Sequence, residues 1–352
     1  MITVLSTDAE VAFVTSRGAI PFADCFKEKL EEGGCSIYPD SSNAEFAVGL
    51  HTCCALLLDN VAGALSMTRD VSRKIKKNVR VVAVPHCSAM AKVDVKLYKK
   101  LGTPESTMSG CNPSRHAMHG CEYVRPFGEM EYEEVLLKHG TPLGTHIHMN
   151  VPLHRLKGIV KYDAERYRFD TESFSEKLLS EWLKQRIAMY LIPVLYIMKG
   201  ANDDDNIRER FKLLPPGYFR LKSYGIELKD APSTVLRHPA YMAAAFMSAR
   251  AIIDASRPRK FNVNEALDAI ANVDREKIEY LFKILHPALH KVDYVSYGSI
   301  EMWERIASYS PSFDIFKEWK IKEYSLDEYT KGLHRGHNLG LISSSWDVGN
   351  HK

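Results

Sequence analysis

The feature that most constrains this chain is the placement of charged side chains at alternate positions of strand-like segments. Asp8 and Glu10 are separated by one residue in the β-rich opening segment, and His146 and His148 have the same spacing in residues 144–151. Alternate side chains of a strand share one face of a sheet. Two buried carboxylates repel, so the first pair predicts a solvated edge strand or a cation site. The histidines could face a metal ion, a phosphate or a carboxylate, or form ordinary hydrogen bonds.

Two further segments place charges among strand-forming residues. Glu45 interrupts an otherwise apolar run, where a lone glutamate is more often simply exposed. Residues 217–228 predict a pair of strands around a turn, with Arg220, Lys222 and Glu227 near that turn. Bases and an acid that meet across a hairpin suit phosphate transfer and metal binding, but a structural ion pair would have the same sequence.

The order of these segments predicts two parts of one chain of 352 residues. Strand-like and helix-like segments alternate up to about residue 238, and residues 51–77 and 173–199 have helical spacing of apolar residues. Helical segments follow Pro239. We therefore expect a mixed catalytic part, residues 1–238, and a helical C-terminal part, residues 239–352, packed on it. An exposed acidic loop is expected at residues 203–205.

Charge and apolar patterning exclude several classes of protein. The formal net charge of +3 is too small for a protein that wraps nucleic acid. Acidic residues stand where the apolar part of a secretory signal would begin, and the longest uncharged apolar run, residues 187–198, is too short to cross a bilayer. We expect a cytoplasmic protein whose seven cysteines are mostly free thiols.

Zinc chemistry is a competing hypothesis. Cys111, His116, His119 and Cys121 offer the thiolate and imidazole ligands that Zn²⁺ prefers, although their spacing fits no standard finger or ribbon. A zinc-dependent hydrolase is therefore kept as an alternative. The chain contains no Gly-rich phosphate loop and no dinucleotide fingerprint, which disfavours P-loop and Rossmann chemistry.

Five segments, in order over residues 1–238, resemble motifs of the phage carboxylate-amine ligases, the second type of amidoligase in the glutamine synthetase-like superfamily. The chain departs from the family at Ala9 and Ser41, and at Lys229, where an arginine is usual. Lysine keeps the charge but lacks the bidentate fork of a guanidinium. The segments are Asp8-Ala9-Glu10, Asp40 with Glu45-Phe46, Gly110-Cys111-Asn112-Pro113, Gly144-Thr145-His146-Ile147-His148, and Gly217 to Glu227.

The resemblance implies an α+β fold, with a curved antiparallel sheet that binds ATP and Mg²⁺ on its concave face and helices behind it. It implies that a carboxylate is phosphorylated to an acyl phosphate, which an amine attacks to form an amide. The implied metal ligands are Asp8, Glu10, Glu45, His146 and Glu227. The implied nucleotide contacts are His146, His148, Arg220 and Lys222. The implied catalytic residues are Arg220, Lys222 and Lys229, whose positive charges act on the phosphate.

The resemblance leaves the substrates and the assembly open. The carboxylate is a small molecule such as an amino acid, and the amine acceptor is a modified base of viral DNA, a cell-wall fragment, a polyamine or a protein side chain. Oligomers are common among related folds. A noncatalytic ligand-binding or assembly scaffold is the alternative, because Lys229 and the changed loop residues depart from the family. The one trace of a DNA acceptor is a basic helix, although a solvated face is the favoured interpretation of its residues Arg69, Arg73, Lys74, Lys76 and Lys77.

Overall fold

The computed structural model describes the sheet strands, most helices and their short connections. The described residues are 4–15, 18–20, 30–32, 35–40, 43–75, 79–87, 114–119, 123–124, 140–151, 154–160, 176–222, 224–292 and 297–321.

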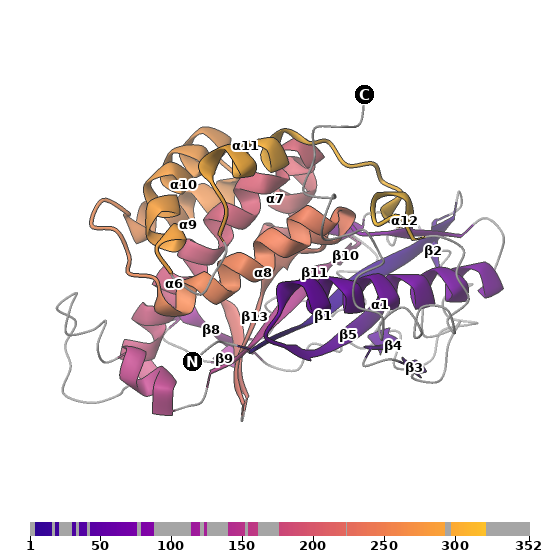
Figure 1. The fold of residues 1–352 in the computed structure, drawn as a ribbon, viewed down its shortest axis with the longest axis horizontal. Helices are drawn as coiled ribbons and strands as arrows, with labels where there is room; N and C mark the ends of the chain where they lie inside the picture. Colours follow the sequence, from indigo (N-terminus) through magenta and orange to yellow (C-terminus); the bar gives the residue numbers. More distant parts are fainter. Residues whose placement is uncertain are drawn as a thin grey trace.

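A large antiparallel sheet forms the centre of the described fold (Figure 1). It has 11 strands, and the long strand β1 (Val4–Thr15) pairs with four others, which places the opening segment in the middle of the sheet. The order is β3 (Leu30–Glu32), β4 (Cys35–Asp40), β5 (Asn43–His51), β1, β11 (Gly144–Asn150), β13 (Gly225–Pro232), β12 (Tyr218–Lys222), β8 (Ser114–His116) and β9 (Tyr123–Val124), with β2 (Gly18–Ile20) and β6 (Arg80–Val82) beside β1. A separate pair joins β7 (His86–Cys87) to β10 (Thr141–Pro142).

Helices cover one face of this sheet because the strands alternate between apolar and charged residues. In β1 the side chains of Leu5, Ala9 and Val11 are fully buried. Helices α1 (Cys54–Ile75) and α8 (Pro239–Asp254) pack beside each other and against strands β5 and β11 (Figure 1). Charged residues of the same strands therefore point to the opposite face.

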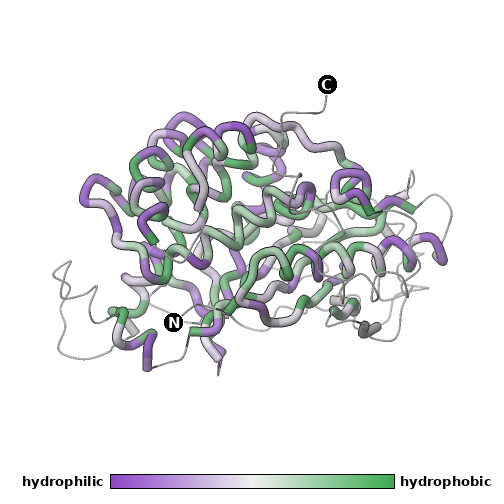
Figure 2. Tube along the Cα trace, in the orientation of Figure 1, coloured by the Kyte–Doolittle hydropathy of each residue, from purple (hydrophilic) through white to green (hydrophobic). Residues whose placement is uncertain are grey.

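The remaining helices extend the same apolar core. Figure 2 shows hydrophobic residues concentrated between the helices and the sheet, and hydrophilic residues on the outer helical turns. One core cluster runs from Leu5 to Trp319, so residues before and after 238 share it. The predicted division at residue 238 stays a prediction. These helices are α6 (Glu176–Ile197), α7 (Asp204–Leu213), α9 (Val263–Asn272), α10 (Arg275–His290), α11 (Ile300–Ser308) and α12 (Ile315–Glu318), with another helix at residues 154–160.

The sequence-based prediction of an α+β fold, with an antiparallel sheet and a helical C-terminal region, is confirmed. The prediction of an exposed acidic loop at residues 203–205 is confirmed for the exposure of Asp205 but is wrong for Asp203, and Asp204 and Asp205 belong to the first turn of α7. Asp203 is buried just before α7, and its carboxylate lies 2.6 Å from the Arg237 guanidinium. Local sequence patterns predict that an acidic residue is exposed when the partner that allows its burial is distant in sequence.

None of the described helices is long and apolar enough to span a membrane. Within the described residues, Cys35, Cys53 and Cys54 are free thiols.

Candidate metal and anion site

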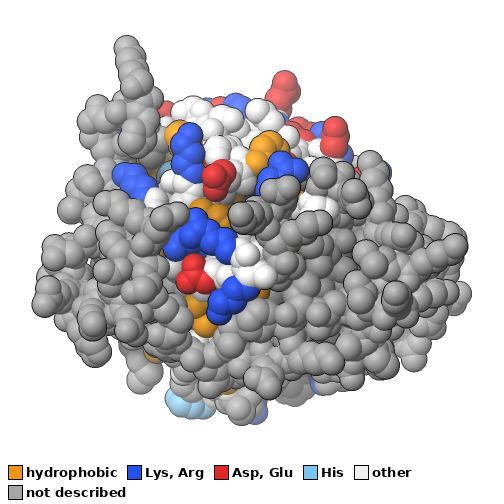
Figure 3. Space-filling view, turned by 90° about the vertical axis from the view of Figure 1, so that its right-hand side faces the viewer, with side chains coloured by type: hydrophobic (Ala, Val, Ile, Leu, Met, Phe, Trp, Pro, Cys, Tyr) orange, Lys and Arg blue, Asp and Glu red, His pale blue; other side chains and the backbone are white. Residues whose placement is uncertain are grey.

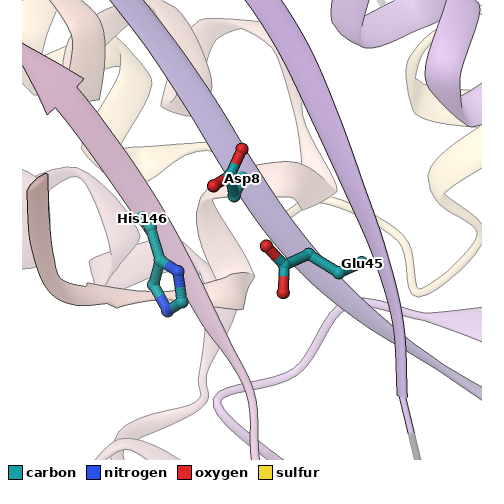
Figure 4. A group of neighbouring side chains, drawn as sticks. All are labelled: Asp8, Glu45 and His146. Carbon is teal, nitrogen blue, oxygen red and sulfur yellow. The ribbon is translucent and has the colours of Figure 1, made fainter. Parts of the chain in front are cut away.

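Three neighbouring strands bring together two carboxylates and an imidazole. In the register of the sheet Asp8 of β1 lies opposite His146 of β11, and Glu45 comes from β5 on the other side of β1. One ligand atom from each side chain lies within 4.8 Å of the other two. Figure 4 shows Asp8 on the central strand, with Glu45 and His146 approaching from the strands on either side. This spacing fits shared coordination of one ion.

The imidazole of this group is in the form that binds metals. His146 is buried, and this burial, reinforced by the nearby positive charge of Lys229, holds the pKa of its imidazole well below 6.5. A neutral imidazole has a lone pair available for a cation. Two carboxylates and a neutral imidazole therefore fit a divalent cation such as Mg²⁺ or Mn²⁺.

A hydrogen bond fixes the carboxylate of Glu45. The hydroxyl of Tyr38, which lies opposite Glu45 in the β4–β5 pair, donates to Glu45 Oε1 over 2.7 Å. Since Glu45 is 7% exposed, this contact orients a carboxylate that has little access to bulk water. Sequence reasoning missed Tyr38, because it is identified only by the pairing of two strands.

Glu10 lies in the same region but has a different contact. Its Oε2 accepts the backbone N–H of Gly144 over 2.6 Å, at the start of β11. Its partner in the register is Glu45, so both predicted carboxylates are on the same face. Glu10 is outside the group whose ligand atoms lie within 4.8 Å of one another, and its observed contact joins β1 to β11.

His148 connects the acidic strand to the turn before β13. Its Nε2 lies 2.8 Å from Asp8 Oδ2, and its Nδ1 lies 2.5 Å from the Tyr224 hydroxyl oxygen. Burial, together with the negative charges of Glu227 and Asp8, raises the pKa of Tyr224 to about 12. A protonated Tyr224 can donate to Nδ1, which leaves the proton on Nε2 to be donated to Asp8.

The basic residues gather around one buried carboxylate on strands β12 and β13. Glu227 is 1% exposed and lies opposite Arg220 in the register. Burial alone would raise the pKa of Glu227, but the surrounding positive charges, led by Lys229 and Arg220, hold it below 4.5. The distances to its oxygens are 3.1 Å from Lys222 Nζ, 3.6 Å from Arg220 Nη1, 3.7 Å from Lys229 Nζ and 3.6 Å from His146 Nδ1.

Two buried residues behind this basic cluster hold its strands in place. Asp230 Oδ1 accepts the N–H groups of Gly217 and Tyr218 over 2.8 and 3.2 Å, which fixes the start of β12. Arg210 donates to the carbonyl oxygens of Leu143 and Lys229. Burial raises the pKa of Asp230 to about 6. Sequence reasoning did not identify Asp230 or Arg210, because neither falls within a recognised motif.

The two other sequence-based hypotheses are only partly described. His116 and His119 lie close, with ring centroids 4.7 Å apart, but Cys111 and Cys121 lie outside the described residues. The zinc hypothesis therefore stays a prediction.

The basic helix of the DNA hypothesis does not present all its bases to solvent. Arg69 is buried and donates to the carbonyl oxygen of Ile321 over 3.0 Å, so the expectation of a solvated face is wrong there, whereas Arg73 and Lys74 are exposed. Figure 3 faces the side toward which α1 ends, and its described part carries Lys and Arg beside Asp and Glu side chains. Lys76 and Lys77 lie outside the described residues.

Comparisons with known proteins give remote structural likeness and no sequence match. No protein-family model matches the chain, and no curated protein matches it. It is similar to a chain in the crystal structure of the complex between the prokaryotic ubiquitin-like protein Pup and its ligase PafA, with a TM-score of 0.43 and 10% identity, over 98% of this chain and 64% of that one. It is also similar to a bifunctional glutathione synthetase from Pasteurella multocida, with a TM-score of 0.40 and 9% identity, over 98% of this chain and 55% of that one. The chain thus spans less than two thirds of either matched chain.

Proposed function

We propose that this protein is an ATP- and Mg²⁺-dependent ligase that joins a carboxylate to an amine. The observation that carries the proposal is a cation site, formed by Asp8, Glu45 and His146, next to a cluster of three bases on the same sheet face. Phosphoryl transfer needs a metal ion on the phosphate oxygens and fixed positive charges around the group that moves. A site with both elements on rigid strands suits that reaction.

The residues divide into two roles. Asp8, Glu45 and His146 would hold Mg²⁺, which when bound neutralises charge on the β- and γ-phosphate oxygens. Arg220, Lys222 and Lys229 would stabilise the γ-phosphoryl group during transfer. His148 orients Asp8 through the contact described above.

The proposed ligation has two chemical steps. A carboxylate oxygen of the substrate attacks the γ-phosphorus, the bond to the bridging oxygen breaks, and ADP leaves. The amine nitrogen then attacks the acyl carbon, inorganic phosphate leaves with the bonding electrons, and the nitrogen loses a proton as the amide forms. The positive charges of Arg220, Lys222 and Lys229 compensate the negative charge of the phosphoryl group in the first step.

The sequence motifs support the finer parts of this proposal. They favour a glutamine synthetase-like catalytic part at residues 1–238 in a phage-encoded protein acting in the host cytoplasm. They also favour an amino acid as the carboxylate and an amine acceptor that is a metabolite, a peptide or a modified DNA base. We propose in addition that the protein assembles into oligomers.

The direct test is to detect an activated carboxylate. Wild-type protein is mixed with ATP, Mg²⁺ and the common amino acids in turn, with hydroxylamine as the amine. The proposal predicts equal amounts of ADP and hydroxamate, and the loss of both in Glu45→Ala. Glu209→Ala, at an exposed residue of α7 that pairs with Lys212, is the matched control and should keep wild-type activity. ADP release without hydroxamate, or unchanged turnover in Glu45→Ala, would contradict it.

One observation favours a noncatalytic scaffold as the second candidate. Lys229 is buried against Glu227 and replaces the arginine usual in the superfamily. Without the bidentate fork, an anion can be bound with less exact orientation. A scaffold predicts Mg²⁺-dependent nucleotide binding with no ADP release for any carboxylate and amine tested.

A further inference from the structure

We propose that Glu227 is an internal counterion of the basic side chains of the anion site, and that the metal ion is bound without it. The inference deepens the proposed function, on which it rests for the identity of the anion as a phosphate. It departs from the expectation of the sequence motifs, which place Glu227 among the metal ligands.

The contacts of Glu227 show why it suits this role. Its Oε2 lies 3.1 Å from Lys222 Nζ, and its Oε1 lies within 4 Å of both Arg220 and Lys229. The basic side chains come from both strands of one hairpin: Arg220 and Lys222 are on β12, and Lys229 is on β13. A buried carboxylate among three bases draws their flexible side chains to one point.

The charge balance argues against a metal ion at this carboxylate. The three bases and Glu227 together carry two formal positive charges, which favours an anion. A divalent ion bound to Glu227 would lie close to several positive charges in a site of restricted water access, where repulsion is strong. The carboxylates of Asp8 and Glu45, by contrast, form a group with a neutral imidazole.

Geometry gives an independent reason. Within the described residues, the group whose ligand atoms lie within 4.8 Å of one another contains Asp8, Glu45 and His146, and it does not include Glu227. His146 lies between the two halves, with its Nδ1 3.6 Å from Glu227. The cation and the anion are therefore bound on adjacent strands, with Glu227 on the side of the anion.

The inference predicts that metal affinity and anion affinity respond separately to Glu227→Gln. The amide is nearly isosteric but neutral, so Mn²⁺ affinity should stay within about threefold of wild type, whereas a true ligand should lose about tenfold or more. Affinity for tripolyphosphate without metal should increase several-fold, because an internal competitor for the bases is gone. A merely structural role for Glu227 would lower this affinity.

The experiment titrates Mn²⁺ alone and tripolyphosphate alone into wild type, Glu227→Gln and the matched variant Glu45→Gln. Free Mn²⁺ is followed by electron paramagnetic resonance, and calorimetry follows tripolyphosphate. Loss of Mn²⁺ binding in Glu45→Gln but not in Glu227→Gln, with tighter tripolyphosphate binding in the latter, supports the inference. Equal loss of Mn²⁺ binding in both variants overturns it, as does a wild type that binds no Mn²⁺.

A second variant keeps the test decisive if Glu227→Gln does not fold. Glu227→Asp keeps the charge but withdraws the carboxylate by one methylene. As a counterion it should leave Mn²⁺ affinity unchanged, while a shortened metal ligand should weaken it. If only the proposed ligase function is wrong, the variants should still show the predicted Mn²⁺ and tripolyphosphate responses, but the protein should activate no carboxylate with ATP.

Discussion

At the scale of single residues, the site depends on side chains that orient other side chains. The Tyr38 hydroxyl binds the carboxylate of Glu45, and His148 lies between Asp8 and Tyr224. A carboxylate whose second oxygen is fixed loses less rotational freedom when it binds a cation. Residues that touch no substrate can therefore set the metal affinity.

Tyr38→Phe tests this at one atom. The change removes the hydroxyl that donates to Glu45 and keeps the ring, so Mn²⁺ affinity should fall by about tenfold with the fold intact. Calorimetric titration with Mn²⁺ measures the affinity, and circular dichroism controls for folding. An unchanged affinity would show that Glu45 is held by other contacts.

The buried pair of Arg237 and Asp203 should dominate local stability. Arg237→Ala leaves Asp203, which is 2% exposed, without its guanidinium, and should lower the free energy of unfolding by about 3–5 kcal/mol. Urea unfolding measures this. Arg208→Ala breaks a solvent-exposed pair with Asp205 and should cost less than about 1 kcal/mol. Similar losses in the two variants would contradict the role of burial.

At the scale of elements, the hairpin of β12 and β13 carries the basic residues of the proposed anion site, and its start and turn are fixed by contacts on β11 and β13. Asp230 receives two backbone N–H groups at the start of β12. Gly225 begins β13 with a φ of +156°, close to the backbone of β11. Both features place the bases relative to His146.

Gly225→Ala should separate these strands. A Cβ there would lie 2.0 Å from the carbonyl oxygen of Met149, so the backbone must move, and we expect a loss of at least about 1–3 kcal/mol in unfolding free energy. Gly158→Ala is the control, because a Cβ there meets nothing within 4 Å and the helix should gain up to about 1 kcal/mol. Urea unfolding measures the stability of both variants, and equal stabilities would contradict the close approach of Gly225 to the backbone of β11.

Asp230 should give the stability of this element a pH dependence. Burial raises the pKa of Asp230 from 3.8 to about 6, so between these pH values the folded state keeps a proton that the unfolded state has already released. The protonation of Asp230 therefore contributes ~3 kcal/mol to the free energy of unfolding below about pH 4, and this contribution is lost as the pH rises through about 6. Asp230→Asn should remove this trend. Unfolding curves at several pH values compare the two proteins, and parallel pH profiles would contradict the assignment.

At the scale of the whole molecule, local sequence patterns predict the strands but not their register. Alternation places Asp8 with Glu10 and His146 with His148 on shared faces, and the sheet confirms that these strands are neighbours. The pairing of β4 with β5, which brings Tyr38 to Glu45, depends on long-range packing that alternation cannot reveal. The burial of Asp203 cannot be predicted locally for the same reason, since its partner Arg237 is distant in sequence.

The central claim is that one face of the sheet holds a cation site next to an anion site. Calorimetric titration of the full chain with ATP, with and without Mg²⁺, in wild type and in Glu45→Ala, tests it most directly. We predict tight ATP binding only with Mg²⁺ in wild type, and loss of this metal dependence in the variant. Mg²⁺-dependent ATP binding that is equal in both proteins, or no ATP binding by folded wild type, would contradict the claim.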